Sequence, residues 1–387
     1  MENNYVKVHI HTEFSNGTTN IDSVTKYKDY ISRAKELGMK AIAFTEHGNI
    51  FGWYNKKNEC EKNGLKYIHG VEAYVTENLD EKIRDNYHCL LYAKNFEGFK
   101  ELNKLITKSY KRNDGHFYYA PRITFEELLN TSDNIIVCTA CLGGMLNKAR
   151  DKKYLFDKFT SFLSDNKDRC FLEIQHHNVL DQIEYNKELY YLSKKLGVRL
   201  IAGTDTHCLN ETHVKGRSIL QKAKNIHFSD EDGWDLTFKS YDELIECYRE
   251  QNSLPMHTVI DAINNTNVLA DMVEEFKIDT SYKYPKISKN PEEELKKKIV
   301  KGIKERGIHK YPNYKDEYVP RINYELKTYK HNGAIDFLLL EEDIKSAVRE
   351  KGVLPGYSRG SVSGSIIAYL LKITDMDSIK HKLNFER

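Results

Sequence analysis

Long apolar runs are absent from this sequence of 387 residues. A membrane helix needs about 18 or more consecutive apolar residues, so we expect no transmembrane segment and no membrane partner. The first residues, from Met1 to Lys7, also lack the apolar core of a signal peptide. We therefore expect a cytoplasmic protein.

A large excess of charge of either sign is also absent. The 59 Lys and Arg residues nearly balance the 57 Asp and Glu residues, which leaves a formal net charge of +2. This balance excludes a histone-like DNA-wrapping protein and an acidic tail protein. With 40% hydrophobic residues, 21 Gly and 7 Pro, the chain is neither disordered nor collagen-like. The length predicts two or three domains.

Cysteines are few and odd in number. The seven are Cys60, Cys89, Cys138, Cys141, Cys170, Cys208 and Cys247. An odd, scattered set predicts free thiols in a reducing compartment rather than a disulfide framework. Cys138 and Cys141 form a C-x-x-C pair, but no second pair accompanies it, so a zinc knuckle or a redox pair is the less favoured interpretation.

Short apolar runs and amphipathic stretches do alternate through the first 230 residues. The runs predict strands, with helical segments between most of them, at residues 41–44, 65–75, 88–92, 135–138, 170–174 and 199–202. Near the N-terminus, Val6, Val8 and Ile10 alternate with His9 and His11, which predicts a strand with an apolar and a histidine face. The alternation predicts an α/β fold with a parallel sheet, open or closed into a barrel.

The second half of the chain has a different pattern. Residues 238–276 read as helical, and residues 278–291 contain two prolines and little periodicity. We expect a linker there, with one domain over residues 1–282 and another over 283–387. Lysines and arginines outnumber acidic residues between 291 and 330, which predicts a solvated helical face.

Metal-capable side chains gather where the predicted strands end. They are His9, His11, Glu46, His47, Glu72, His88, Cys141, Asp205 and His207. Sites of parallel α/β folds lie at that end of the strands. Imidazole with carboxylate suits Zn, Mn or Fe, and a thiolate favours zinc. Glu72 could bridge two ions, and a multinuclear site would activate water and bind phosphate, which is phosphodiester chemistry.

The same residues resemble the successive motifs of the PHP (polymerase and histidinol phosphatase) family. The matching segments are His9-x-His11, residues 45–49, residues 70–74, His88, residues 140–144 and Asp205-x-His207. The resemblance implies a distorted β/α barrel with two to three Zn or Mn ions. It assigns one ion to His9, His11, Glu72 and Asp205, a second to Glu72, His88 and Cys141, and a third to His47 and His207.

Two positions depart from the family pattern. Glu46 stands where Asp is usual, and Asn16 stands where an Asp or His ligand is common. Both remain weaker candidates for the metal site. His69, His176 and His177 match no ligand position, and we expect them to support the ligands or to lie on the surface.

Residues 352–365 are rich in small residues and precede an apolar stretch at 366–371. Amides at such a helix start can hold phosphate, and Arg359 adds a guanidinium, although a capped helix explains the pattern as well. The segment resembles the palm entry of the bacterial DNA polymerase III alpha family. This resemblance implies an incomplete α+β palm segment in which nucleotide phosphate is bound by Arg359, Gly360, Ser361, Gly364 and Ser365.

The resemblance also sets functional expectations. In that family the catalytic Asp-x-Asp motif follows the Phe-Glu-Arg element, here 385–387, and Asp375 and Asp377 do not correspond to it. We expect no polymerisation residues in this chain and no polymerase activity of the chain alone. A completed polymerase would use DNA, dNTP, Mg, a C-terminal polypeptide and replisome subunits. Two alternatives remain: a metal-dependent phosphoesterase, such as a 3′–5′ exonuclease, and a non-catalytic structural module.

Overall fold

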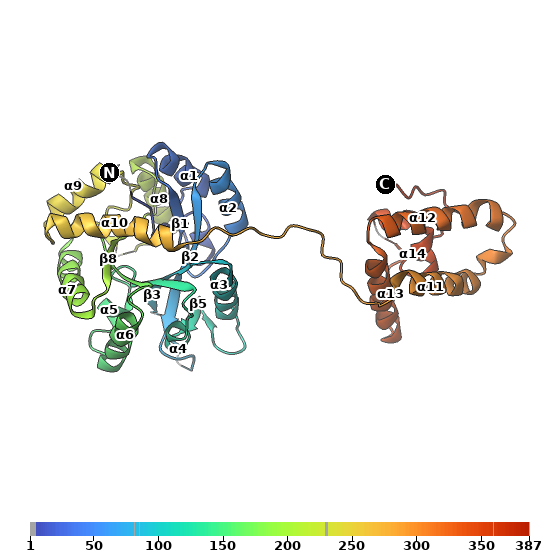
Figure 1. Cartoon of the computed structure of the whole chain (residues 1–387), viewed down its shortest axis with the longest axis horizontal. Coiled ribbons are helices and arrows are strands. Elements are labelled where there is room, and N and C mark those ends of the chain that lie inside the picture. The colour runs from blue at the N-terminus through green and yellow to red at the C-terminus, as the bar shows by residue number, and fades with distance from the viewer. Residues whose placement is uncertain (1–4, 81, 85, 229–230, 359, 387) are drawn as a thin grey trace. The chain divides into compact units, whose positions relative to one another are not determined.

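The computed structural model describes residues 5–80, 82–84, 86–228, 231–358 and 360–386. The chain forms two compact units, Met1–Lys277 and Ile278–Arg387 (Figure 1). Phe276 packs on Phe99 of the first unit, and the amides of Ile287 and Ser288 donate to Asp336 of the second. Within the described residues, no helix combines the length and apolarity needed to cross a bilayer.

The first unit is a mixed sheet surrounded by helices (Figure 1). Its strands are β1 (Ala41–Phe44), β2 (Lys66–Thr76), β3 (Tyr87–Ala93), β4 (Phe117–Tyr118), β5 (Ala120–Thr124), β6 (Ile135–Cys138), β7 (Cys170–Ile174) and β8 (Arg199–Ala202). Its α-helices are α1 (Tyr27–Glu36), α2 (Trp53–Lys62), α3 (Phe96–Ser109), α4 (Phe125–Leu129), α5 (Met145–Lys148), α6 (Lys153–Asp165), α7 (Leu180–Leu196), α8 (Glu211–Ala223), α9 (Tyr241–Gln251) and α10 (Met256–Met272).

The sheet is mixed rather than parallel, so that part of the sequence prediction is wrong. β3 runs antiparallel to both of its neighbours, β2 and β6, whereas β1–β2, β2–β5, β6–β7 and β7–β8 are parallel pairs. Residues 77–86 between β2 and β3 are fewer than the dozen or so that a helical crossover requires, so these two strands can only pair antiparallel.

The N-terminal segment connects β1 with the chain just after β8. Lys7 forms a parallel bridge with Ile42 of β1, and Ile10 forms one with Thr206, just after β8. The chain bends at His9 between these bridges. Val6 and Val8 consequently join the core inside the curled sheet, whereas Ile10 joins the core outside it. The predicted common face of Val6, Val8 and Ile10 is therefore wrong.

Two apolar cores hold the first unit together. The inner core contains side chains such as Ile68, Leu90 and Phe171, together with Leu269 of α10. The outer core fills the space between the sheet and its helices. Each fully buried aliphatic or aromatic side chain stabilises the fold by about 1.5–3 kcal/mol. This rigid frame fixes the strand ends on which the polar residues stand.

The second unit is helical in its described residues. It comprises α11 (Pro291–Arg306), α12 (Val319–His331), α13 (Ile335–Glu350) and α14 (Ile366–Leu370), with short turns between them. Leu295, Ile322, Leu338 and Ile367 belong to its separate core. The predicted palm segment was α+β, but residues 278–386, apart from 359, form no strand. Their apolar residues recur at the helical spacing of three and four, which favours helices.

Candidate metal centre

All eight principal ligand candidates lie at one end of the sheet. His9 and His11 come from the N-terminal segment, His47 follows β1, and Asp205 and His207 follow β8. Glu72 lies in β2, His88 in β3, and Cys141 follows β6. The eight are buried except His88, whose side chain is 22% exposed.

The first predicted group is tightly assembled. The Nε2 atoms of His9 and His11 lie 3.2 Å apart, and each lies 3.2 Å from Oδ1 of Asp205. The two oxygens of Glu72 lie 3.5 Å from His9 Nε2 and 3.4 Å from His11 Nε2. The ligand atoms of His9, His11 and Asp205 thus form one close group, with Glu72 beside the two imidazoles.

The second predicted group shares Glu72. Oε1 of Glu72 lies 3.0 Å from Nδ1 of His88 and 3.9 Å from Sγ of Cys141, and the His88 and Cys141 atoms lie 3.7 Å apart. Gly143 makes room for this group, since a Cβ there would lie 2.8 Å from the His88 ring. Glu72 is therefore placed to serve two neighbouring ions.

The third group contains a residue that the sequence reasoning missed. His47 and His207 both stack on His11, with ring centroids 4.0 and 4.4 Å from it. Asp22 lies between them, 3.2 Å from His47 Nε2 and 3.1 Å from His207 Nδ1. Asp22 sits in a loop without periodicity, so no pattern marked it.

Several of these buried atoms lack hydrogen-bond partners. His47 Nδ1 and Glu72 Oε2 lie only 2.8 Å apart, and His207 Nδ1 and Asp22 Oδ2 only 3.1 Å apart, yet none of the four makes an aligned hydrogen bond. Buried polar atoms are normally paired. Close atoms that converge without bonding one another fit a divalent cation, so the donor set suits the metal that the family resemblance implies.

The electrostatics of the cluster point the same way. Burial works against the charged form of Asp205 and Glu72, but the surrounding histidines hold the pKa of both carboxyls well below the usual range. Burial and the neighbouring His47 and His207 lower the pKa of His11 to about 4. Against burial, Asp22 and Asp205 raise the pKa of His207 to about 10. A bound metal would replace such protons.

Glu173 in β7 is a second residue that the sequence reasoning did not assign to the site. Its Oε1 lies 2.7 Å from Nδ1 of His9, so it can fix the ring with Nε2 facing the cluster. A Cβ at position 203 would lie 1.9 Å from the same oxygen, so Gly203 makes room for this carboxylate. The available signal was a buried acid within an apolar strand.

The weaker candidates stand apart from the cluster. Glu46 accepts hydrogen bonds from Thr12 and Ser15 and pairs with the buried Lys56 at 2.5 Å. Asn16 donates to the carbonyl of Ser23 and accepts from the amide of Asp22, so it shapes the loop that carries Asp22. Neither belongs to a metal-capable group among the described residues.

The three unassigned histidines are buried, so the expectation that they could lie on the surface is wrong. His69 contacts the Tyr67 hydroxyl and the Asn103 amide oxygen, away from the cluster. His177 stacks on Trp234, with ring centroids 4.6 Å apart. His176 lies beside it with a ring centroid distance of 4.8 Å.

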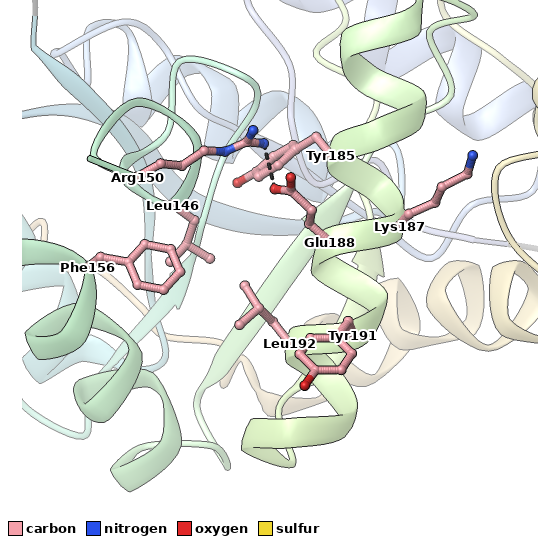
Figure 2. Close-up of a pocket in the computed structure, with 8 residues that line it drawn as sticks. All are labelled: Leu146, Arg150, Phe156, Tyr185, Lys187, Glu188, Tyr191 and Leu192. Atoms are coloured by element: carbon pink, nitrogen blue, oxygen red, sulfur yellow. Dashed lines mark ion pairs between the residues drawn. The ribbon is translucent and has the colours of Figure 1, made fainter. Parts of the chain in front are cut away.

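The cluster opens into a pocket of about 540 Å³. Its lining includes six site residues: Asp22, His47, His88, Cys141, Asp205 and His207. A separate pocket between α5, α6 and α7 is shown in Figure 2. That pocket has largely apolar walls and an Arg150–Glu188 ion pair of 2.6 Å, and none of the predicted site residues lines it.

Two of the phosphate-binding candidates of the second unit, Gly364 and Ser365, contact other parts of the chain. Arg359 lies outside the described residues. Glu325, buried on α12, accepts hydrogen bonds from Ser365 Oγ and from the amides of Ile366 and Ile367 at the start of α14. A Cβ at Gly364 would lie 2.0 Å from the carbonyl oxygen of Asn384, so close packing accounts for this glycine. Gly360 and Ser361 form a short turn before Gly364.

Comparisons with known proteins match both units. Residues 7–177 match the PHP domain model, and residues 293–387 match the model described as the bacterial DNA polymerase III alpha NTPase domain. DNA polymerase III subunit alpha of Aquifex aeolicus is 31% identical over 100% of this chain and 35% of its own length. The Borreliella burgdorferi subunit is 31% identical over 99% of this chain and 34% of its own length.

The solved structures are more distant. A structure from Bifidobacterium adolescentis, described as a metal-dependent phosphoesterase, covers 52% of this chain and 87% of its own at 16% identity and a TM-score of 0.36, too low to bear on function. The chain spans about a third of the length of the curated relatives it matches. Both domain models match in chain order, and the chain is similar along its whole length to DNA polymerase III alpha subunits.

Proposed function

We propose that this chain is the N-terminal portion of a replicative DNA polymerase of the polymerase III alpha type. Similarity along the whole chain to subunits about three times as long carries this proposal. Polymerisation would then need a C-terminal polypeptide that supplies the Mg-binding carboxylates and most contacts with DNA and dNTP. Replisome subunits would be further partners, and the cytoplasm is the expected location.

The second unit supports the view that this chain does not polymerise alone. Asp375 pairs with Arg306 at 2.6 Å and with Arg349 at 3.5 Å. Asp377 accepts from the Tyr318 hydroxyl at 2.9 Å and from two backbone amides. Among its described residues, no three metal-ligating side chains come together, whereas nucleotidyl transfer requires a two-metal carboxylate site.

Primer extension tests this proposal. The purified chain should extend no primer in the presence of Mg and all four dNTPs. Addition of a polypeptide with the missing palm motifs, encoded in the same genome, should restore extension. Extension by the chain alone would contradict the proposal, and so would failure of every such polypeptide to bind the chain.

A second candidate function rests on the metal centre itself. We propose a metal-dependent phosphoesterase, with a 3′–5′ exonuclease as the most specific form. The supporting observation is the set of neighbouring ligand groups, several of whose members line one pocket. Zn or Mn ions held there would supply an activated water and neutralise phosphate charge. His47 and His88 line the pocket, where they would face a phosphate ester.

Glu72→Gln provides the decisive variant for this second function. Removing the carboxylate charge should lower the metal content and abolish hydrolysis of 3′-labelled single-stranded DNA, since both oxygens face histidine nitrogens of neighbouring groups. Glu184→Gln, at an exposed position of α7, is the matched control and should change neither property.

The assay also separates enzyme from structural module. Metal-dependent hydrolysis by the wild type, sensitive to chelator and to Glu72→Gln, supports the phosphoesterase. If the wild type binds metal, loses thermal stability on chelation and still cleaves no DNA, the centre is structural and the phosphoesterase proposal fails.

A further inference from the structure

A second group of metal-ligating side chains lies apart from the principal cluster. His176, Asp235 and Cys247 each place a ligand atom within 4.8 Å of the other two. None of the three belongs to another metal-capable group of the described residues. They come from three separate segments: the exit of β7, the loop before α9, and α9 itself.

The imidazole of His176 has no partner in the described structure. The residue is only 2% exposed, yet neither Nδ1 nor Nε2 makes a hydrogen bond. A buried polar group without a partner costs about 1–3 kcal/mol. Burial and the adjacent His177 hold the pKa of His176 well below its usual value, so the ring is neutral and can bind a cation.

The other two ligands are accessible to solvent ions. Cys247 and Asp235 are partly exposed. Against burial, Lys239 and Thr237 hold the pKa of Asp235 at about 2, so this carboxylate is ionised. Lys239 pairs with its Oδ2, and Thr237 donates to Oδ1 at 2.8 Å. An arriving divalent ion would displace the flexible lysine rather than break a rigid contact.

The surrounding structure holds the three segments in place. Gln251, at the end of α9, donates to the carbonyl oxygens of Gln175 and His177, on either side of His176. The hydroxyl of Tyr248, next to Cys247, donates to the carbonyl of Ile174. Thr237 forms a bridge with Cys208 and anchors the loop of Asp235. These contacts fix the backbones, so small side-chain adjustments suffice to close the ligand set.

We propose that His176, Asp235 and Cys247 bind an additional divalent cation of the zinc class, separate from the Glu72 centre. Imidazole, carboxylate and thiolate are the three ligand types that the borderline-soft Zn²⁺ ion binds, and one of each leaves a fourth position for water. Ligand atoms at about 2.0–2.3 Å from a tetrahedral ion lie roughly 3.5 Å from one another. The ligand atoms of the three residues lie within 4.8 Å of one another, so small side-chain movements would bring them to that spacing. The ion would tie α9 to the exit of β7.

Cobalt substitution in the full-length chain tests this proposal. Thiolate-bound Co²⁺ has a near-ultraviolet charge-transfer band, and Cys141 of the principal centre contributes to it as well. Cys141→Ser should therefore keep part of the band, and Cys141→Ser combined with Cys247→Ser should lose it. Total loss of the band in Cys141→Ser alone would overturn the proposal, as would an unchanged band in the double variant.

Elemental analysis provides the second readout. After zinc loading, His176→Ala and Cys247→Ser should each hold about one equivalent less than the wild type. His257→Ala, at an exposed position of α10, is the matched control and should hold the wild-type amount. Cys247 is partly exposed, so its serine variant tests the site even if His176→Ala fails to fold. Equal zinc in Cys247→Ser and the wild type would refute the additional site.

Discussion

At the scale of residues, the candidate metal centre contains side chains that contact the candidate ligands as well as the candidate ligands themselves. The side chains that the family motifs assign to one ion lie close together in the structure. Short motifs at strand ends can indicate such groups. Asp22 and Glu173 were missed because their roles depend on tertiary contacts with His47, His207 and His9. A loop acid and a buried strand acid carry no spacing signal of their own.

Glu173→Gln tests the supporting role. The carboxylate 2.7 Å from His9 Nδ1 fixes the ring and raises its basicity. We expect zinc or manganese affinity to fall about 10–100-fold while the number of ions bound at saturation stays the same. Isothermal titration measures both quantities. An unchanged affinity, or a lost equivalent at saturation, would contradict a positioning role.

At the scale of elements, buried charges fix loops and helix ends that sequence patterns left undefined. The loop after His11 is held by Glu46, whose carboxylate contacts Thr12, Ser15 and the ammonium of Lys56. The sequence placed Glu46 among candidate ligands because it precedes His47 at a strand end. In the structure, the Glu46 side chain instead points towards Lys56 of α2. This direction depends on how α2 packs, which the sequence pattern does not show.

Glu46→Gln distinguishes these two roles. It leaves the buried Lys56 without a counter-charge, and breaking such a pair costs about 3–5 kcal/mol. We expect lower thermal stability of the first unit, with the full number of metal ions still bound at saturating concentration. Loss of one bound ion without a change in stability would return Glu46 to the ligand set.

Glu325 has the equivalent role in the second unit. It is fully buried, pairs with Arg321 at 2.8 Å and accepts from the first amides of α14. Glu325→Ala should lower the stability of this unit by about 3 kcal/mol. Hydrogen exchange should show faster amide exchange in α14 and α12. Unaltered exchange there would show that α14 is held by its apolar contacts alone.

At the scale of the whole molecule, the two units have separate apolar cores. The α/β character of the first unit followed from the alternation of apolar runs, and six predicted strands correspond to β1, β2, β3, β6, β7 and β8. The antiparallel β3 was missed because strand direction depends on connection length rather than on strand residues. Strands were expected in the second unit because the family resemblance outweighed its local helical periodicity.

The independence of the cores has a measurable consequence. The apolar residues of the second unit form a cluster of their own. We therefore expect Glu325→Ala to leave metal binding by the first unit unchanged. A parallel loss of metal would show that the two units are coupled.

Anomalous X-ray scattering from crystals of the zinc- or manganese-loaded chain tests the central claim most directly. The account predicts peaks about 2.0–2.3 Å from ligand atoms of His9, His11 and Asp205, and from those of Glu72, His88 and Cys141. Absence of anomalous density between these side chains in a fully loaded crystal would contradict it.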